Sequence, residues 1–293
     1  MELICEENVS PQKVDTDEII WHYTTANVLN EFLKEGSILY GTHHRFLNDG
    51  KEISYGRELF SSSIRELPEV SKYADLLLNE INPQYMDSYL FCFSYKNDDL
   101  YQWRSYTTGG GFAIGFKQNS IFQLVREFKK KYEPQVPPGG RIPKYLEDIR
   151  MDFQDCEYSI SQSRERIKGC VSILYMPTFC DPELHIPTEL IDKSNMESLI
   201  RLRDQIVWFC KHPSFACEKE TRIACFGHPL RQKIEYIGGK PRVPLFPVPR
   251  DGIVEITVSP HGNVSQNQLL AELLRDRYKL NYKITCSHSS FVG

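Results

Sequence analysis

The stretch "YLFCFSYKNDDLYQWRSYTTGGGFAIGF" (residues 89–116) decides the fold class expected for this chain. Aromatic residues alternate with smaller ones over residues 89–95, which is the two-residue period of a β-strand, and residues 111–116 form a second apolar strand pattern. The polar segment between them reads as irregular chain, and its glycines lack the spacing of dinucleotide- or phosphate-binding loops. Without the glycine fingerprint of a parallel βαβ unit, the pattern favours an α+β domain with a mixed or antiparallel sheet.

Helical and strand patterns of uneven length surround this stretch. Helical periodicity covers residues 28–35, 52–79, 189–210 and 267–278, and strand patterns cover 170–176, 218–226, 252–259 and 282–290. Charged helical sequence also runs from about 121 to 166, interrupted by "PQVPPGGRIP" (134–143). We therefore predict one α+β domain over residues 1–293, with a mixed or antiparallel sheet core, flanking helices and a helical insertion around 121–168.

The composition is that of an ordinary globular protein, with 41% hydrophobic and 25% charged residues among 293. A net charge of −4 argues against a general nucleic-acid or membrane-surface binder. No run reaches the roughly 18 apolar residues of a membrane helix, and no secretory signal pattern opens the chain. The nine cysteines include no C-x-x-C pair, and no histidine spacing suits a metal. We expect a cytoplasmic protein that binds neither a membrane nor a metal ion.

The segment "CEKETRIACF" (217–226) carries the clearest candidate chemistry. If it is a strand throughout, Glu218, Glu220 and Arg222 project from one face. Two carboxylates this close raise one pKa and need a cation or a ligand to offset their charge. The alternative is a solvent-facing strand whose charges form surface pairs.

Two further segments are candidates for a binding site. "WHYTT" (21–25) places a histidine, a tyrosine and two threonines between a short strand and a helix, where a plain turn would use Gly, Asn or Pro. Tyr101, Trp103 and Tyr106 offer flat faces for stacking, and the glycines at 109–111 allow close approach of a ligand. Each feature also has a structural explanation: a hydrogen-bonded histidine, aromatic cover of the core, or a flexible turn.

Four stretches taken together resemble a bacterial family of proteins of unknown function. They occur in the order of that family, and they are "WHYTT" (21–25), "FLNDGKE" (46–52), "FCFSYKNDDLYQWRSYTTGGGFAIGF" (91–116) and "EKETRI" (218–223). Gly50 departs from the family pattern, in which proline follows Asn-Asp. That family in turn resembles the ADP-ribosyltransferase superfamily. The resemblance implies an ADP-ribosyltransferase-like fold and NAD as the substrate.

The resemblance also implies roles for individual residues. His22 would contact the ribose of NAD's adenosine, and Tyr106 or Ser94 would pack on the nicotinamide. Glu220 would be the catalytic glutamate at the nicotinamide ribose, with Glu218 assisting the acceptor. An ionised carboxylate there would stabilise the oxocarbenium-like transition state, and a second could take the acceptor's proton.

Among the remaining expected contacts, Thr24 would bind sugar hydroxyls and Tyr23 would offer a stacking face. Arg222, Arg104 or Arg45 would meet the pyrophosphate. The sequence therefore predicts an enzyme that transfers ADP-ribose from NAD to a macromolecular acceptor, protein or nucleic acid. A toxin or anti-phage defence role is an implication of the resemblance alone. Two alternatives stay open: an NAD glycohydrolase with water as acceptor, and a non-catalytic nucleotide-sensing module of the same fold.

Overall fold

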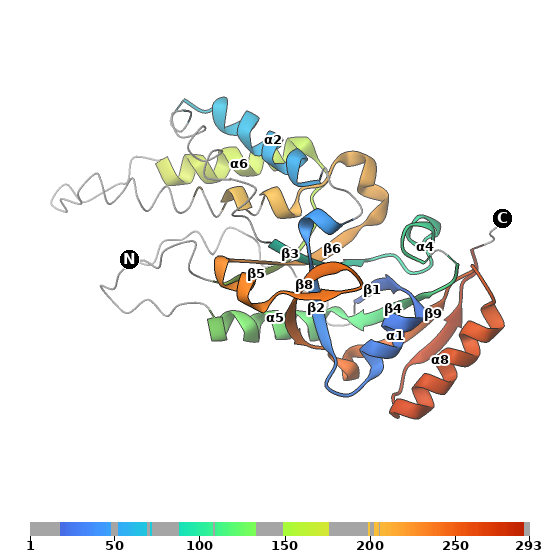
Figure 1. Ribbon diagram of the computed structural model, residues 1–293. Helices are drawn as coiled ribbons and strands as arrows, with labels where there is room; N and C mark the ends of the chain where they lie inside the picture. Colours follow the sequence, from blue (N-terminus) through green and yellow to red (C-terminus); the bar gives the residue numbers. More distant parts are fainter. Residues whose placement is uncertain are drawn as a thin grey trace.

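The computed structural model describes residues 18–47, 52–68, 71, 88–107, 109–132, 149–175, 199, 202–204 and 206–289. Within these ranges ten strands form one sheet (Figure 1). The strands are β1 (Ile19–Thr24), β2 (Ile38–His43), β3 (Ser88–Ser94), β4 (Phe112–Lys117), β5 (Arg150–Asp155), β6 (Glu220–Phe226), β7 (Glu235–Ile237), β8 (Lys240–Pro247), β9 (Ile253–Val258) and β10 (Lys283–Cys286). The main path runs β10-β9-β4-β1-β3-β2-β8-β7, and β6 joins β5 to β3. Because β9 and β10 are parallel while the other pairs are antiparallel, the sheet is mixed.

The sheet branches at β3. β6 pairs with β3 along its whole length, from Ser88 to Ser94. On the other edge β2 pairs with β3 only at Tyr89 and Leu90, and β1 pairs with it only at Ser94. Among the described strands, none pairs with this edge between Leu90 and Ser94. β1 and β2 therefore diverge from β3 and leave an open stretch of strand edge between them.

Helices cover both faces of the sheet (Figure 1). They are α1 (Ala26–Leu33), α2 (Glu52–Arg65), α4 (Leu100–Tyr106), α5 (Gln118–Tyr132), α6 (Ile160–Tyr175) and α8 (Val264–Tyr278). The face that carries Phe91, Phe93 and Ile223 packs on α1, α5 and α8. The opposite face, with Leu90 and Ala224, packs on the helical residues 207–209. Figure 1 shows α2 and α6 side by side over this second face, where they form a further layer.

The predicted α+β architecture, a mixed sheet with flanking helices, is confirmed. The strand predicted at 170–176 is wrong, because residues 170–175 are the last turns of α6. The charged segment predicted to be helical contains β5, whose Met151 and Phe153 point into the core. The polar segment predicted to be irregular contains α4, and residues 48–51 of the stretch "FLNDGKE" (46–52) lie outside the described residues.

Each of these differences has a physical reason. A short run of apolar residues such as 170–176 cannot be assigned to helix or strand by periodicity alone. α4 begins because the Asp99 carboxylate accepts hydrogen bonds from the backbone N–H groups of Tyr101 (3.0 Å) and Gln102 (3.2 Å).

None of the helices within the described ranges has both the length and the apolar character needed to cross a membrane.

Candidate functional site

His22 fills the gap where β1 and β2 diverge from β3. Its Nδ1 lies 3.0 Å from the carbonyl oxygen of Cys92, on the open edge of β3. Because a carbonyl oxygen only accepts, Nδ1 carries the proton and Nε2 is left as an acceptor. The imidazole stacks on the ring of Phe91 at 4.3 Å between centroids. Burial lowers the pKa of His22 to about 4, so the ring is neutral at pH 7.

Four buried charged side chains form a network beside this gap. Lys211 Nζ donates to Glu218 Oε2 at 2.5 Å and to Glu220 Oε2 at 2.7 Å. Arg222 Nε donates to the other oxygen of Glu220, Oε1, at 2.7 Å. All four residues are buried, with exposed fractions between 2% and 6%. The alternative of exposed surface pairs is therefore wrong.

The charges of this network balance, with two carboxylates facing two cations. Burial opposes ionisation of Glu220, but Arg222 and Lys211 more than offset it and lower the pKa of this carboxyl to about 2. Glu220 is therefore ionised at neutral pH. A carboxylate held in this way keeps its charge when water is excluded, which is the condition for stabilising a developing positive charge.

The two glutamates meet by a route that differs from the predicted continuous strand. Glu218 ends a short 3₁₀ helix (Pro213–Glu218), Lys219 adopts a left-handed conformation with φ 43°, and β6 begins at Glu220. Ser94 Oγ donates to the carbonyl oxygen of Glu218 at 2.6 Å, and the Tyr158 hydroxyl accepts from the Glu220 N–H at 2.9 Å. These bonds fix the backbone turn that brings both carboxylates to Lys211.

A cavity of about 50 Å³ opens beside Glu218 and Glu220. Six of the ten predicted site residues line it, and they are His22, Tyr23, Ser94, Tyr106, Glu218 and Glu220. The other lining residues are Trp21, Cys92, Phe93 and Gln102. The fold thus brings together β1, the β3–α4 segment and the start of β6, which are far apart in the sequence.

The other predicted residues are not among those that line the cavity. Thr24 is buried at the end of β1, where its carbonyl oxygen faces Gly111. Arg222 is buried and holds Glu220, and Arg104 is exposed on α4. Arg45 belongs to a 3₁₀ turn after β2. In this structure no predicted arginine is placed to meet a pyrophosphate inside the cavity.

α4 supplies two of the lining residues. Its Trp103 is fully buried and packs edge-on against the ring of Tyr23 at 4.6 Å. Gln102 is buried beside it, and Tyr106 keeps 39% of its surface exposed. Tyr106 therefore lies between the cavity and solvent. In the sequence, the N-cap residue Asp99 could have indicated this helix. No local pattern indicated that Lys211 or Cys92 belongs to the site.

The size of the cavity limits what it can hold. A volume of about 50 Å³ has room for a few water molecules, while pockets for whole ligands measure roughly 300–1,000 Å³. A dinucleotide could place only one end in this cavity, and the wall that carries Tyr106 would have to move to admit it.

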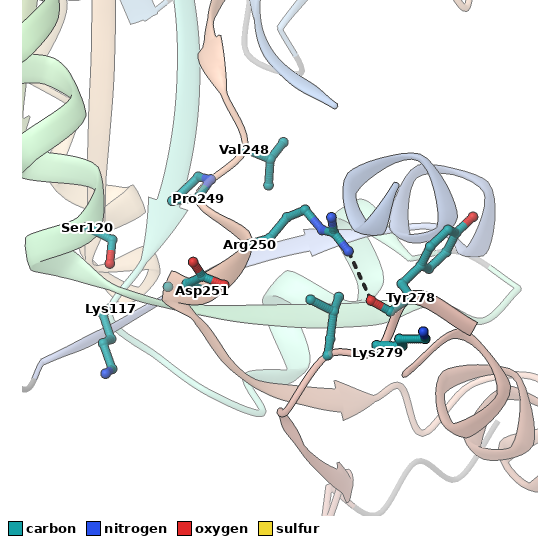
Figure 2. A pocket seen from close by; sticks show the side chains of 10 residues that line it. Lys117, Ser120, Val248, Pro249, Arg250, Asp251, Tyr278 and Lys279 are labelled. Atoms are coloured by element: carbon teal, nitrogen blue, oxygen red, sulfur yellow. Dashed lines mark hydrogen bonds between the residues drawn. The ribbon is translucent and has the colours of Figure 1, made fainter. Parts of the chain in front are cut away.

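A larger cavity of about 660 Å³ lies between the start of α5, the link from β8 to β9, and the end of α8 (Figure 2). Lys117 and Lys279 lie on opposite sides of it in Figure 2, with Arg250 and Asp251 between them. One guanidinium nitrogen of Arg250 donates to the carbonyl oxygen of Tyr278 at 3.1 Å, so it caps the C-terminal end of α8. None of the predicted site residues lines this cavity.

Over the described ranges, no group of His, Cys, Asp and Glu side chains could hold a metal ion.

Part of the chain matches a known family. Residues 102–223 match the model of a family described as "Protein of unknown function (DUF2971)". The matched segment begins at Gln102 and includes Tyr106, Lys211 and both glutamates. No curated protein and no solved structure matches the chain.

Proposed function

We propose that this chain is an NAD-dependent ADP-ribosyltransferase with an ADP-ribosyltransferase-like fold, acting on a macromolecular acceptor. One observation carries the proposal: three segments chosen from the sequence for this chemistry line one cavity. They supply His22, Ser94 with Tyr106, and the glutamate pair. Chance proximity of six such residues around one small cavity is a poor explanation in a sheet of ten strands.

The chemistry assigned to the cavity follows from its charges. Glu220, ionised at neutral pH, would lie beside the nicotinamide ribose and stabilise the positive charge that develops there. The bond from ribose to nicotinamide breaks and its electron pair leaves with nicotinamide. The acceptor's nucleophile then bonds to the ribose carbon, and its proton passes to Glu218.

Neutral residues would bind the ribose and nicotinamide parts of NAD. His22, with Nδ1 held by Cys92, presents Nε2 as an acceptor for a ribose hydroxyl. The ring of Tyr106, partly exposed at the cavity, would stack on nicotinamide. The rest of the dinucleotide and the acceptor would lie outside the cavity, because the space within it is too small for them.

The test is release of nicotinamide by the purified chain incubated with NAD, with and without cell lysate, followed by chromatography. Glu220→Gln should reduce the release at least about a hundredfold, because it removes the charge that stabilises the transition state. Glu31→Gln, at an exposed ion pair on α1, is the matched control and should leave the rate unchanged. Circular dichroism and a thermal melt verify that each variant folds.

The lysate separates two reactions. Release that needs lysate indicates transfer to an acceptor, and release without it indicates hydrolysis with water as acceptor. A folded chain that releases no nicotinamide under either condition would refute both enzymatic readings.

A non-catalytic nucleotide-sensing module is the second candidate, and a specific observation favours it. Each oxygen of Glu220 already contacts a cation, and Glu218 is paired with Lys211, which weakens it as a base. Such a network could serve stability alone. This candidate predicts NAD binding by calorimetry without nicotinamide release.

A further inference from the structure

Asp98 joins two segments that are almost 190 residues apart in the sequence. It lies in the short loop between β3 and α4, in a left-handed conformation with φ 59°. Its carboxylate accepts hydrogen bonds from the indole N–H of Trp103 at 2.8 Å, from the backbone N–H of His288 at 2.7 Å, and from the hydroxyl of Ser287. Ser289 Oγ adds a bond to the same carboxylate at 3.2 Å.

Residues 287–289 follow β10, and a backbone hydrogen bond joins them to the sheet. The backbone N–H of Ser287 donates to the carbonyl oxygen of Val258, at the end of β9, at 2.9 Å. The hydroxyl groups of Ser287 and Ser289 both donate hydrogen bonds to Asp98. Hydrogen bonds from hydroxyl and amide groups lower the pKa of Asp98 although burial opposes this, so its carboxylate is ionised and the bonds are charge-assisted.

The same short stretch of chain reaches the cavity. Trp103, bonded to Asp98, packs on Tyr23, and the Tyr23 hydroxyl donates to the carbonyl oxygen of Lys96 at 2.9 Å and accepts from the Asp99 N–H at 3.0 Å. Gln102 and Tyr106, on either side of Trp103 in α4, line the cavity together with Tyr23. The seven residues of α4 are thus fixed at their start by bonds centred on Asp98 and Asp99.

We propose that Asp98 and residues 287–289 form a latch that holds α4 against the cavity and thereby controls access to it. Asp98 is then a positioning residue, because it is not among the residues that line the cavity and acts through Trp103 and the two lining residues of α4. A cavity of about 50 Å³ must widen to admit a ligand larger than a few waters, and α4 is the wall that carries Tyr106, which is partly exposed to solvent. Its effect on catalysis rests on the function proposed above, whereas its effect on cavity access does not.

The experiment uses Cys92, which lines the cavity, as a reporter of access. Iodoacetamide labelling of the full chain is followed peptide by peptide by mass spectrometry. Two variants release the latch from its two sides. Asp98→Asn removes the charge and keeps a residue that tolerates the left-handed conformation. The double variant Ser287→Ala/Ser289→Ala leaves the loop and α4 unchanged.

We expect the Cys92 labelling rate to rise roughly tenfold in both variants, because each loses charge-assisted hydrogen bonds that keep α4 closed. Asp276→Asn, at an exposed position on α8, is the control and should label as the unchanged chain does. Fully buried Cys225 in β6 should stay unlabelled throughout, which shows that the variants remain folded. Equal Cys92 rates in the latch variants and the control would overturn the proposal.

Nicotinamide release separates this proposal from the proposed function. Faster Cys92 labelling without any nicotinamide release supports the latch and refutes the enzyme. Unchanged labelling in a chain that does release nicotinamide refutes the latch and leaves the enzyme intact. If the latch and the enzyme activity are both confirmed, Asp98→Asn should change KM for NAD more than kcat, since the latch governs entry and not the chemical step.

Discussion

His22 Nδ1 donates to the carbonyl oxygen of Cys92 at 3.0 Å, across the gap in which β1 and β2 diverge from β3. A backbone carbonyl at an open, buried strand edge needs a donor, and here a side chain replaces the missing neighbouring strand. The structural and the functional interpretations of this histidine are therefore compatible. Nδ1 satisfies the sheet, and Nε2 is left for a ligand.

The burial of His22 predicts a pH dependence of stability. The pKa of His22 is about 4 in the folded chain and 6.5 when unperturbed, so the unfolded chain binds more protons between these values. Stability therefore falls as the pH drops from 7 to 5, and His22 contributes at most about 2 kcal/mol to this loss. Urea unfolding at both pH values should show a smaller loss in His22→Gln than in the unchanged chain.

Two features make this measurement specific. The low pKa of Glu220, about 2, lowers stability mainly below about pH 5, and its effect is the same in both chains. His288→Gln, at an exposed position, is the matched control and should keep the original pH dependence. Identical losses in the His22→Gln and unchanged chains would contradict the prediction.

The buried network predicts a non-additive pair of substitutions. Lys211→Met leaves Glu218 and Glu220 facing each other with one cation fewer, and we expect a loss of about 3–5 kcal/mol in the free energy of unfolding. Adding Glu218→Gln removes the excess charge and should restore about 1–2 kcal/mol. Denaturant unfolding of the double-mutant cycle measures both values.

The control for this cycle is the exposed pair of Lys34 and Glu31. Lys34→Met should change stability by less than about 0.5 kcal/mol, because exposed pairs contribute little. Additive effects of Lys211→Met and Glu218→Gln would show that the network is not the unit described here.

The sequence predicted the fold class and much of the cavity because both depend on local signals. Alternation marked β3, and the strand pattern at 218–226 placed Glu220 near the start of β6. β5 was missed although Met151 and Phe153 alternate with polar neighbours, since the charged sequence around them favoured a helix. Hydrophobic periodicity describes one face of a single element. A short strand between two helical patterns is therefore easily assigned to a helix.

The partners of the predicted residues could not be found in the sequence. Lys211 lies in "FCKHPS" (209–214), which has no motif, and only the tertiary fold brings its ammonium group to both glutamates. For Arg222 the sequence indicated the correct face of the strand, but it did not single out Glu220 as the partner of the guanidinium group. Burial of a charge depends on what the rest of the chain places over it.

Tyr106 predicts a graded effect on ligand binding. Tyr106→Ala should weaken NAD binding by about tenfold, because it removes a stacking face worth about 1 kcal/mol beyond its area, whereas Tyr106→Phe should keep the affinity within about threefold. Calorimetric titration with NAD measures both. Tyr236→Ala, on an exposed edge strand, is the control. If Tyr106→Ala and Tyr236→Ala bind NAD equally well, Tyr106 does not stack on the ligand.

Gly111, the last of the three glycines at 109–111, lies in close contact with other parts of the chain. A Cβ added at Gly111 would lie 2.4 Å from the carbonyl oxygen of Thr24 and 2.8 Å from Cβ of Thr107. Because the first of these is a backbone atom at the end of β1, the contact cannot be relieved by rotating a side chain. Gly111→Ala should therefore lower the free energy of unfolding by about 3 kcal/mol.

Gly169, on the exposed side of α6, is the matched position for this change. Nothing lies within 4 Å of a Cβ placed there, and it is helical. Gly169→Ala should therefore raise stability by about 0.5–1 kcal/mol, since alanine favours a helix over glycine. If the same substitution lowers stability at Gly111 and raises it at Gly169, the steric effect of the added Cβ is separated from its effect on backbone freedom. A Gly111→Ala chain as stable as the unchanged chain would show that Gly111 does not lie against the end of β1.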